Sequence, residues 1–114
     1  MIVVDTRLEG AQLWLRLSGE YGHGDENLYS GRAVQKVLEE ALLRHAGNVS
    51  EAVIDYSQVN NIGGDGPIWS VSPAYRQRIP VRCVALGSTY ESLAELFRAT
   101  NMDRLIQLEM GGDK

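Results

Sequence analysis

Hydrophobic and polar residues alternate strictly near the start of the chain, from Gln12 to Ser18. Leucine occupies every second position of this segment, and Trp14 and Arg16 stand between the leucines, a pattern typical of a β-strand with one buried face. Ile2 to Arg7 has the composition of a shorter edge strand, and the turn residues Glu9-Gly10-Ala11 follow it. The pattern therefore predicts an N-terminal β-hairpin.

The next periodic segment extends from Ser30 to Arg44 and has the spacing of an amphipathic helix. Ser30 is placed to cap its N-terminus, and Gly47 is placed to end it. Its apolar positions recur three, four and seven residues apart: Ala33, Val34, Val37, Leu38, Ala41 and Leu42.

A short apolar run, Ala52 to Tyr56, predicts a strand that is covered on both faces. We expect a loop from Asn60 to Gly66 after it, and a helix that begins at Pro67. Because proline clashes with the carbonyl four residues before it, Pro73 predicts either a break near Ser72 or a kinked helix.

The C-terminal third repeats the alternation of strand and helix. Val81 to Leu86 predicts a buried strand, and Ser88 with Glu91 has the capping-box spacing for a helix that ends near Ala99. A short piece and a last strand, Ile106 to Leu108, follow. Together the elements predict one α/β domain over residues 1–110, with a mixed, mostly parallel sheet, and a tail at residues 111–114.

Composition narrows the function classes. The chain has 114 residues, 44% of them hydrophobic, and a net charge of −4, so it lacks the basic surface that nucleic-acid binding needs. No apolar run approaches the length of a membrane span, and no signal peptide is evident. With a single cysteine, Cys83, and two distant histidines, we expect a cytoplasmic protein with no cofactor, no metal and no catalytic residue.

The predicted loop Asn60 to Gly66 carries the most chemical interest, because ligands of open α/β sheets gather where strands end. It holds Gly63, Gly64, Gly66 and a carboxylate, Asp65, directly before a predicted helix. The N–H groups of the first helical turn would hold that carboxylate, and one alternative is that Asp65 is only a helix cap. A metal-dependent enzyme is another alternative, in which four acidic residues converge: Glu20, Asp25, Asp55 and Asp65.

Three segments of the chain resemble the STAS domain family, which includes bacterial anti-sigma-factor antagonists and modules of anion transporters. They are Leu17–Glu20, resembling the family's strand ending; Val53–Val59, resembling its Leu-Asp-x-Ser-x-Val element; and Leu93–Leu105, resembling its last helix and the turn after it. The resemblance implies a mixed sheet with surrounding helices.

The resemblance also implies a role for the loop. The family's Asp-Ser-Ser-Gly sequence, whose last serine is phosphorylated by a partner kinase, corresponds here to residues 63–66, so that Asp65 occupies the phosphoacceptor position. Gly22 stands where relatives usually carry a second functional aspartate. Because phosphoserine carries about −1.5 to −2 charge and a carboxylate −1, Asp65 would imitate the modified state permanently.

The sequence therefore predicts a regulatory module of the anti-sigma-factor-antagonist type that binds a protein partner. An alternative within the resemblance is a subunit that docks on a transporter ATPase, and oligomer formation remains open. The residues expected to contact the partner are Asn61, Gly63, Gly64, Asp65, Gly66 and Trp69.

Overall fold

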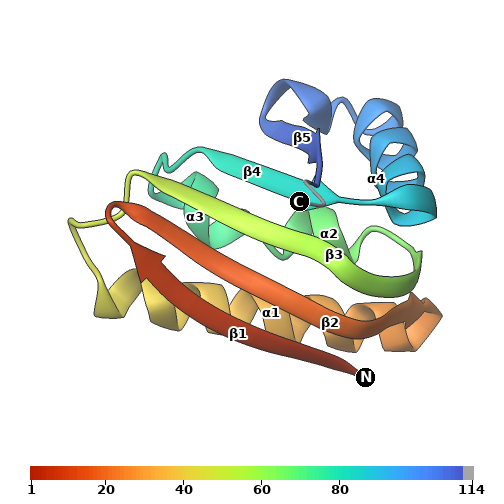
Figure 1. The fold of residues 1–114 in the computed structure, drawn as a ribbon, viewed down its shortest axis with the longest axis horizontal. Helices are drawn as coiled ribbons and strands as arrows, with labels where there is room; N and C mark the ends of the chain where they lie inside the picture. The colour runs from red at the N-terminus through yellow and green to blue at the C-terminus, as the bar shows by residue number, and fades with distance from the viewer. Residues whose placement is uncertain (112–114) are drawn as a thin grey trace.

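Five strands form one sheet in the computed structural model of the chain, which describes residues 1–111 (Figure 1). Their order in the sheet is their order in the sequence; β1 is antiparallel to β2, and the other neighbours are parallel. This mixed, mostly parallel sheet confirms the predicted fold class. The strands are β1 (Ile2–Glu9), β2 (Gln12–His23), β3 (Glu51–Gly63), β4 (Val81–Ala85) and β5 (Ile106–Met110).

The helices lie on one face of the sheet, because right-handed crossovers between successive neighbouring strands all pass over the same side (Figure 1). Helix α1 packs across β1 and β2, and α4 packs against β3, β4 and β5. The helical elements are α1 (Gly24–Arg44), α2 (Gly66–Trp69), α3 (Ser72–Arg76), α4 (Gly87–Ala99) and the 3₁₀ turn η1 (Met102–Arg104).

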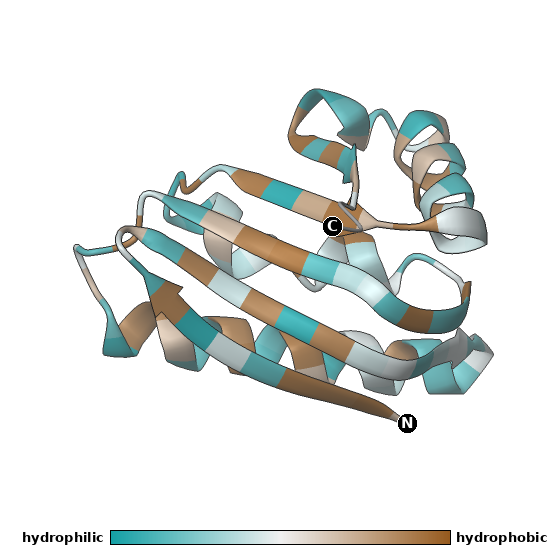
Figure 2. Cartoon of the chain, viewed as in Figure 1, coloured by the Kyte–Doolittle hydropathy of each residue, from teal (hydrophilic) through white to brown (hydrophobic). Residues whose placement is uncertain are grey.

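The core lies between this helical layer and the sheet. Hydrophobic and hydrophilic residues alternate along the strands (Figure 2), so each strand turns one set of side chains toward the helices. The buried set from the strands includes Leu13, Leu15, Leu17, Ile54 and Tyr56, and the helices add Val34, Leu38, Leu93 and Phe97. Burial of this apolar surface provides the main driving force for folding.

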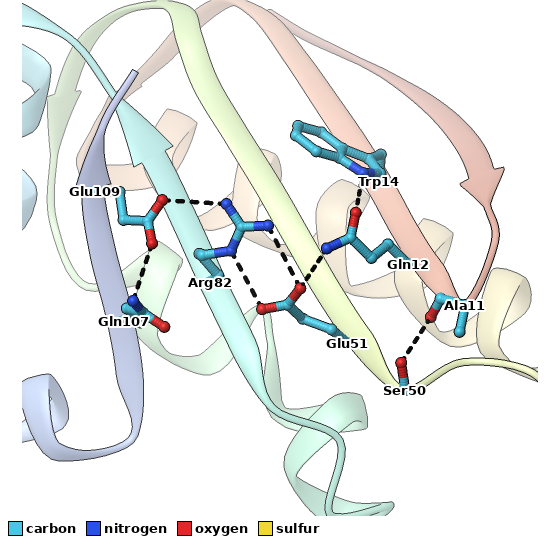
Figure 3. A network of polar contacts seen from close by, with 8 residues as sticks. All are labelled: Ala11, Gln12, Trp14, Ser50, Glu51, Arg82, Gln107 and Glu109. Atoms are coloured by element: carbon cyan, nitrogen blue, oxygen red, sulfur yellow. Dashed lines mark hydrogen bonds and ion pairs between the residues drawn. The ribbon is translucent and has the colours of Figure 1, made fainter. Parts of the chain in front are cut away.

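The other face of the sheet is covered by no helix of residues 1–111 and carries a polar network that links four strands (Figure 3). Arg82 donates to both oxygens of Glu51 at 3.2 and 3.4 Å, and to Glu109 at 3.2 Å. Its guanidinium carbon lies 6.0 Å from the centre of the Trp14 ring. This network provides hydrogen-bond partners for the charged groups. In the strand register Val53 lies between Trp14 and Arg82, which cover it, and Val53 is fully buried.

Helix α1 begins six residues earlier than the sequence pattern predicts. It starts at Gly24, and Ser30 is buried within it and does not cap it. Asp25 and Glu26 occupy the first turn, where negative charge is favourable. The apolar periodicity becomes regular only later, which explains the misplaced boundary.

Strand β3 is also longer than predicted, because it continues through Gly63 and includes most of the expected loop. β2 extends in step with it, and the parallel pairing continues from Glu20 opposite Asn60 to His23 opposite Gly63. β3 pairs with β4 only as far as Asp55. A two-stranded extension therefore brings the end of β3 past β4.

The predicted boundaries of the remaining helices are confirmed in part. Two short helices, α2 and α3, replace a continuous one, and Pro73 lies in the first turn of the second, which confirms the break near Ser72. The capping box at Ser88 is wrong: Leu86 occupies the cap position of α4 and no side chain caps it. Instead, the Thr89 hydroxyl donates to the Val59 carbonyl at 2.8 Å and joins α4 to β3.

At the C-terminus, the Gly111 N–H donates to the Ala85 carbonyl at 2.8 Å. The rest of the predicted tail, residues 112–114, lies outside the described residues. Within residues 1–111, no helix combines the length and the apolar character needed to cross a membrane.

Candidate functional site

Asp65 lies between the end of β3 and the first residue of α2, and its side chain is exposed. It occupies the cap position of α2, yet its carboxylate makes no hydrogen bond to the helix. α2 has four residues, so its dipole is small. The expectation that helical N–H groups hold this carboxylate is therefore wrong.

Asn27, a buried residue of α1, takes the capping role in its place. Its Oδ1 accepts the Gly66 N–H at 2.9 Å, and its Nδ2 donates to the Gly22 carbonyl at 3.1 Å. One side chain thus joins the end of β2, the start of α2 and helix α1. Because Asn27 satisfies the first N–H of α2, the Asp65 carboxylate stays available to solvent.

The glycines around Asp65 are required by close contacts within the chain. A Cβ at Gly64 would lie 2.7 Å from the Asn27 amide, and Gly64 also has a positive φ of 136°. A Cβ at Gly66 would lie 2.6 Å from the same amide. Gly63 is equally restricted by the His23 ring. The close packing that these glycines allow is therefore with other parts of this chain. Gly64 and Asp65 nevertheless remain exposed.

A groove of about 440 Å³ separates Asp65 from helix α4. Its floor is mainly apolar, and exposed carboxylates stand on its two sides, Asp65 on one and Glu95 on the other. Within residues 1–111, neither carboxylate forms an ion pair. The lining residues are Ile62, Gly63, Gly64 and Asp65 before α2, and Ser92, Leu93, Glu95, Leu96 and Ala99 on α4.

Asn61 and Trp69, two other residues expected at the site, do not line this groove. Asn61 has a positive φ of 55°, and its Oδ1 lies 2.6 Å from His23 Nε2, so it joins the two extended strand ends. Trp69 is half-buried, and a Cβ at Gly31 of α1 would lie 2.7 Å from its ring. The side chain of Trp69, the last residue of α2, therefore packs against α1.

The acidic residues of the metal-enzyme alternative do not converge. Asp55 is buried on the helix-free face, where its carboxylate accepts the Ser57 N–H at 2.9 Å and lies 3.6 Å from Arg16. Asp65 lies at the groove instead. In the described part of the chain, no group of three or more His, Cys, Asp or Glu residues is placed to hold a metal ion.

Sequence reasoning missed Asn27 and the α4 side of the groove. The acidic pair Asp25–Glu26 was the available signal for Asn27, since it marks the first turn of a helix and puts Asn27 inside that helix. Glu95 and Leu96 carried no signal of this kind, because their position opposite Asp65 depends on the tertiary packing of α4.

Proteins similar to this chain are found by comparing structures and not by comparing sequences. The sequence matched no protein-family model, and it matched no curated protein. An anti-sigma factor antagonist from Mycobacterium paratuberculosis superposes with a TM-score of 0.69 and 17% identity, over 95% of this chain and 85% of that one. The anti-sigma factor antagonist SpoIIAA in its unphosphorylated form gives a TM-score of 0.66 and 9% identity, over 97% and 90% of the two chains.

The phosphorylated form of SpoIIAA, a Bacillus cell fate determinant, gives a TM-score of 0.65 and 9% identity, over 97% of this chain and 93% of that one. Nearly the whole chain is covered in each case. The fold of this chain is therefore the STAS fold of the anti-sigma factor antagonists.

Proposed function

We propose that this chain is a cytoplasmic, non-enzymatic regulatory module of the anti-sigma-factor-antagonist type. It binds a protein partner at the groove between Asp65 and α4, and Asp65 supplies a permanent negative charge where the STAS family carries its phosphoacceptor serine. The fold shared with anti-sigma factor antagonists supports this class of function.

The observation that carries the proposal is the free carboxylate of Asp65. The side-chain oxygens of a residue kept only as a helix cap would accept hydrogen bonds from the N–H groups of α2, but Asn27 already fills that role. The charge of Asp65 therefore has no role in stabilising the local fold. An exposed charge beside an apolar groove suits recognition of a partner.

The composition of the groove indicates the chemistry of the partner. Ile62, Leu96 and Ala99 offer apolar surface, and Asp65 and Glu95 add negative charge without a basic residue among the lining. A complementary partner segment presents an apolar side chain next to Lys or Arg. Such an arrangement gives both contact area and a preferred orientation.

Affinity capture from the native host tests the proposal. The wild-type chain and Asp65→Asn serve as baits, and Asp103→Asn is the matched control because Asp103 is an exposed carboxylate outside the groove. We expect a regulatory partner, identified by mass spectrometry, to be retained at least fivefold less by Asp65→Asn and equally by the control. Capture of a transporter ATPase component would favour the docking-subunit alternative instead.

A second variant tests the phosphoacceptor position directly. Asp65→Ser places a hydroxyl where STAS relatives are phosphorylated, and incubation with host extract and labelled ATP should add phosphate to this variant alone. The wild-type chain should remain unlabelled at residue 65. Equal partner binding by wild type, Asp65→Asn and Asp65→Ser would contradict a role for this charge.

A further inference from the structure

Strand β1 forms one edge of the sheet, and in the described residues it pairs only with β2. Its eight residues leave a row of backbone N–H and C=O groups open for pairing with another strand. Val3 on this strand is 54% exposed. Edge strands of this length are usually protected by charged residues, proline or bulges, or are covered by another segment.

We propose that a second copy of this chain covers the edge, with the two β1 strands pairing antiparallel around a two-fold axis at Thr6. In this register Thr6 faces its own counterpart, Asp5 faces the Arg7 of the second copy, and Val4 faces the Leu8 of the second copy. The sheet then continues through both copies. This inference is independent of the function proposed for the groove.

The charges on β1 favour this partner and this register. Asp5 and Arg7 both belong to the set of β1 side chains on the helix-free face, and the two-fold axis brings them together twice. In the single chain, Arg7 pairs with Glu9 on its own strand at 2.8 Å, and both side chains are about half exposed. Such an exposed pair is weak, so Arg7 can exchange it for Asp5 of the second copy.

Helix α1 offers a matching second layer beneath the strands. Five of its residues share one face by helical spacing, and the ends of that face are apolar while its middle carries Lys36 and Glu40. Tyr29 is 64% exposed and Leu43 is 69% exposed. An antiparallel pair of such faces that puts Lys36 against Glu40 also puts Leu43 against Ala33, one helical turn from Tyr29. The face consists of Tyr29, Ala33, Lys36, Glu40 and Leu43.

The dimensions of the two layers agree. Strands pair about 4.8 Å apart, so a helix that lies between the β1–β2 boundary and β2, as α1 does, would be about 10 to 14 Å from its symmetry mate. The lower end of this range is the usual distance between packed helices. A cleft of about 410 Å³ between the start of β1 and the Tyr29 and Ala33 side chains is open to receive Leu43 of the second copy.

Register-specific cross-linking tests the proposal on the full chain. Thr6→Cys places a thiol on the axis, where opposite Cα atoms of an antiparallel pair lie about 4.5 to 5.5 Å apart, within disulfide range. Val3→Cys is the matched control, because two such thiols would be about 20 Å apart. The native Cys83 is fully buried and does not interfere.

We expect Thr6→Cys to form a disulfide-linked dimer on mild oxidation and Val3→Cys to stay monomeric. Sedimentation velocity of the wild-type chain from about 1 to 500 μM should show a reversible monomer–dimer equilibrium. A wild type that is monomeric throughout this range, or equal cross-linking of the two variants, would overturn the proposal.

Charge exchange provides a second readout that does not depend on cysteine chemistry. Asp5→Arg and Arg7→Asp should each weaken dimerisation about tenfold, because each places like charges opposite one another twice. The double variant Asp5→Arg/Arg7→Asp should regain wild-type affinity. Circular dichroism confirms that each variant is folded, and a double variant no stronger than the single ones would contradict the register.

Discussion

Asn27 is the single residue on which the geometry around Asp65 depends most. It is buried, and its two hydrogen bonds join α1 to the Gly22 carbonyl and the Gly66 N–H. Asn27→Ala would leave both backbone groups buried without a partner, and each unsatisfied group costs about 1–3 kcal/mol. We expect a loss of about 2–4 kcal/mol in the free energy of unfolding, measured by urea denaturation.

A matched substitution isolates this effect from the general cost of removing an asparagine. Asn48 is exposed and its side chain makes no hydrogen bond within the described residues, so Asn48→Ala should change stability by less than about 0.5 kcal/mol. Similar losses for the two variants would show that Asn27 does not have the capping role.

Three tyrosine hydroxyls, on Tyr21, Tyr56 and Tyr75, are buried without a hydrogen-bond partner among residues 1–111. Tyr56 is fully buried, and its burial raises the pKa of its hydroxyl well above the ordinary value. Tyr56→Phe removes the unsatisfied hydroxyl and keeps the ring. The free energy of unfolding should therefore stay equal or rise by up to about 1 kcal/mol in chemical denaturation.

The exposed Tyr29 provides the comparison for this substitution, since its hydroxyl is hydrated in both the folded and unfolded chain. Tyr29→Phe should leave the stability of the monomer unchanged. A loss above about 1 kcal/mol for Tyr56→Phe would indicate that its hydroxyl makes a stabilising contact, such as one to the neighbouring Ser70.

The sequence identified Asp65 as a candidate functional residue but did not predict which residues surround it. Its exposure follows from glycine neighbours and a short loop, which are local features. The loss of its capping role follows from Asn27, a residue 38 positions away on another helix, and no local pattern encodes that contact.

Between elements, the polar network on the helix-free face links β2, β3, β4 and β5 through Arg82 and Glu51. The hydrogen bonds that Arg82 donates to Glu51 lower the pKa of Glu51 and raise the pKa of Arg82. Because the folded-state pKa of Glu51 is lowered, its ionised form stabilises the fold above the unfolded pKa of about 4.3, and this contribution disappears as pH falls through the folded pKa.

Glu51→Gln should therefore reduce the free energy of unfolding by up to about 1 kcal/mol at pH 7, a modest value because the pair is partly exposed. The difference from wild type should shrink below about pH 4. Urea denaturation from pH 3 to 7 measures it. Glu91→Gln, which removes an exposed carboxylate from α4, should show no such pH dependence.

Element boundaries were predictable where a single residue decides them and unpredictable where pairing decides them. Pro73 breaks the helix by its own geometry, so the split into α2 and α3 followed from sequence. β3 continues through polar residues from Asn60 onward because β2 supplies hydrogen bonds beside it. Segments of this kind lack the apolar pattern of a strand, and only the tertiary structure defines them.

For the molecule as a whole, the groove unites parts that are distant in sequence, and this explains why only half of it was predicted. The STAS resemblance drew attention to residues 63–66 but not to α4. Thr89 fixes the start of α4 to β3, so Glu95 and Leu96 come to face Asp65 across the groove. The fold therefore supplies the second wall of the groove.

The charge of this groove, within a chain of net charge −4, makes a prediction about how any partner is held. Exposed ion pairs weaken with added salt because mobile ions screen them over about 8–10 Å at physiological ionic strength. A partner captured by the wild-type chain through basic side chains should elute at a higher NaCl concentration than from Asp65→Asn or Glu95→Gln baits, in a gradient from low to high salt. The Asp103→Asn bait should match wild type. Elution that is identical for all four baits would mean that the partner is held by contacts other than these two carboxylates, and the site would then have to be sought on another face of the fold.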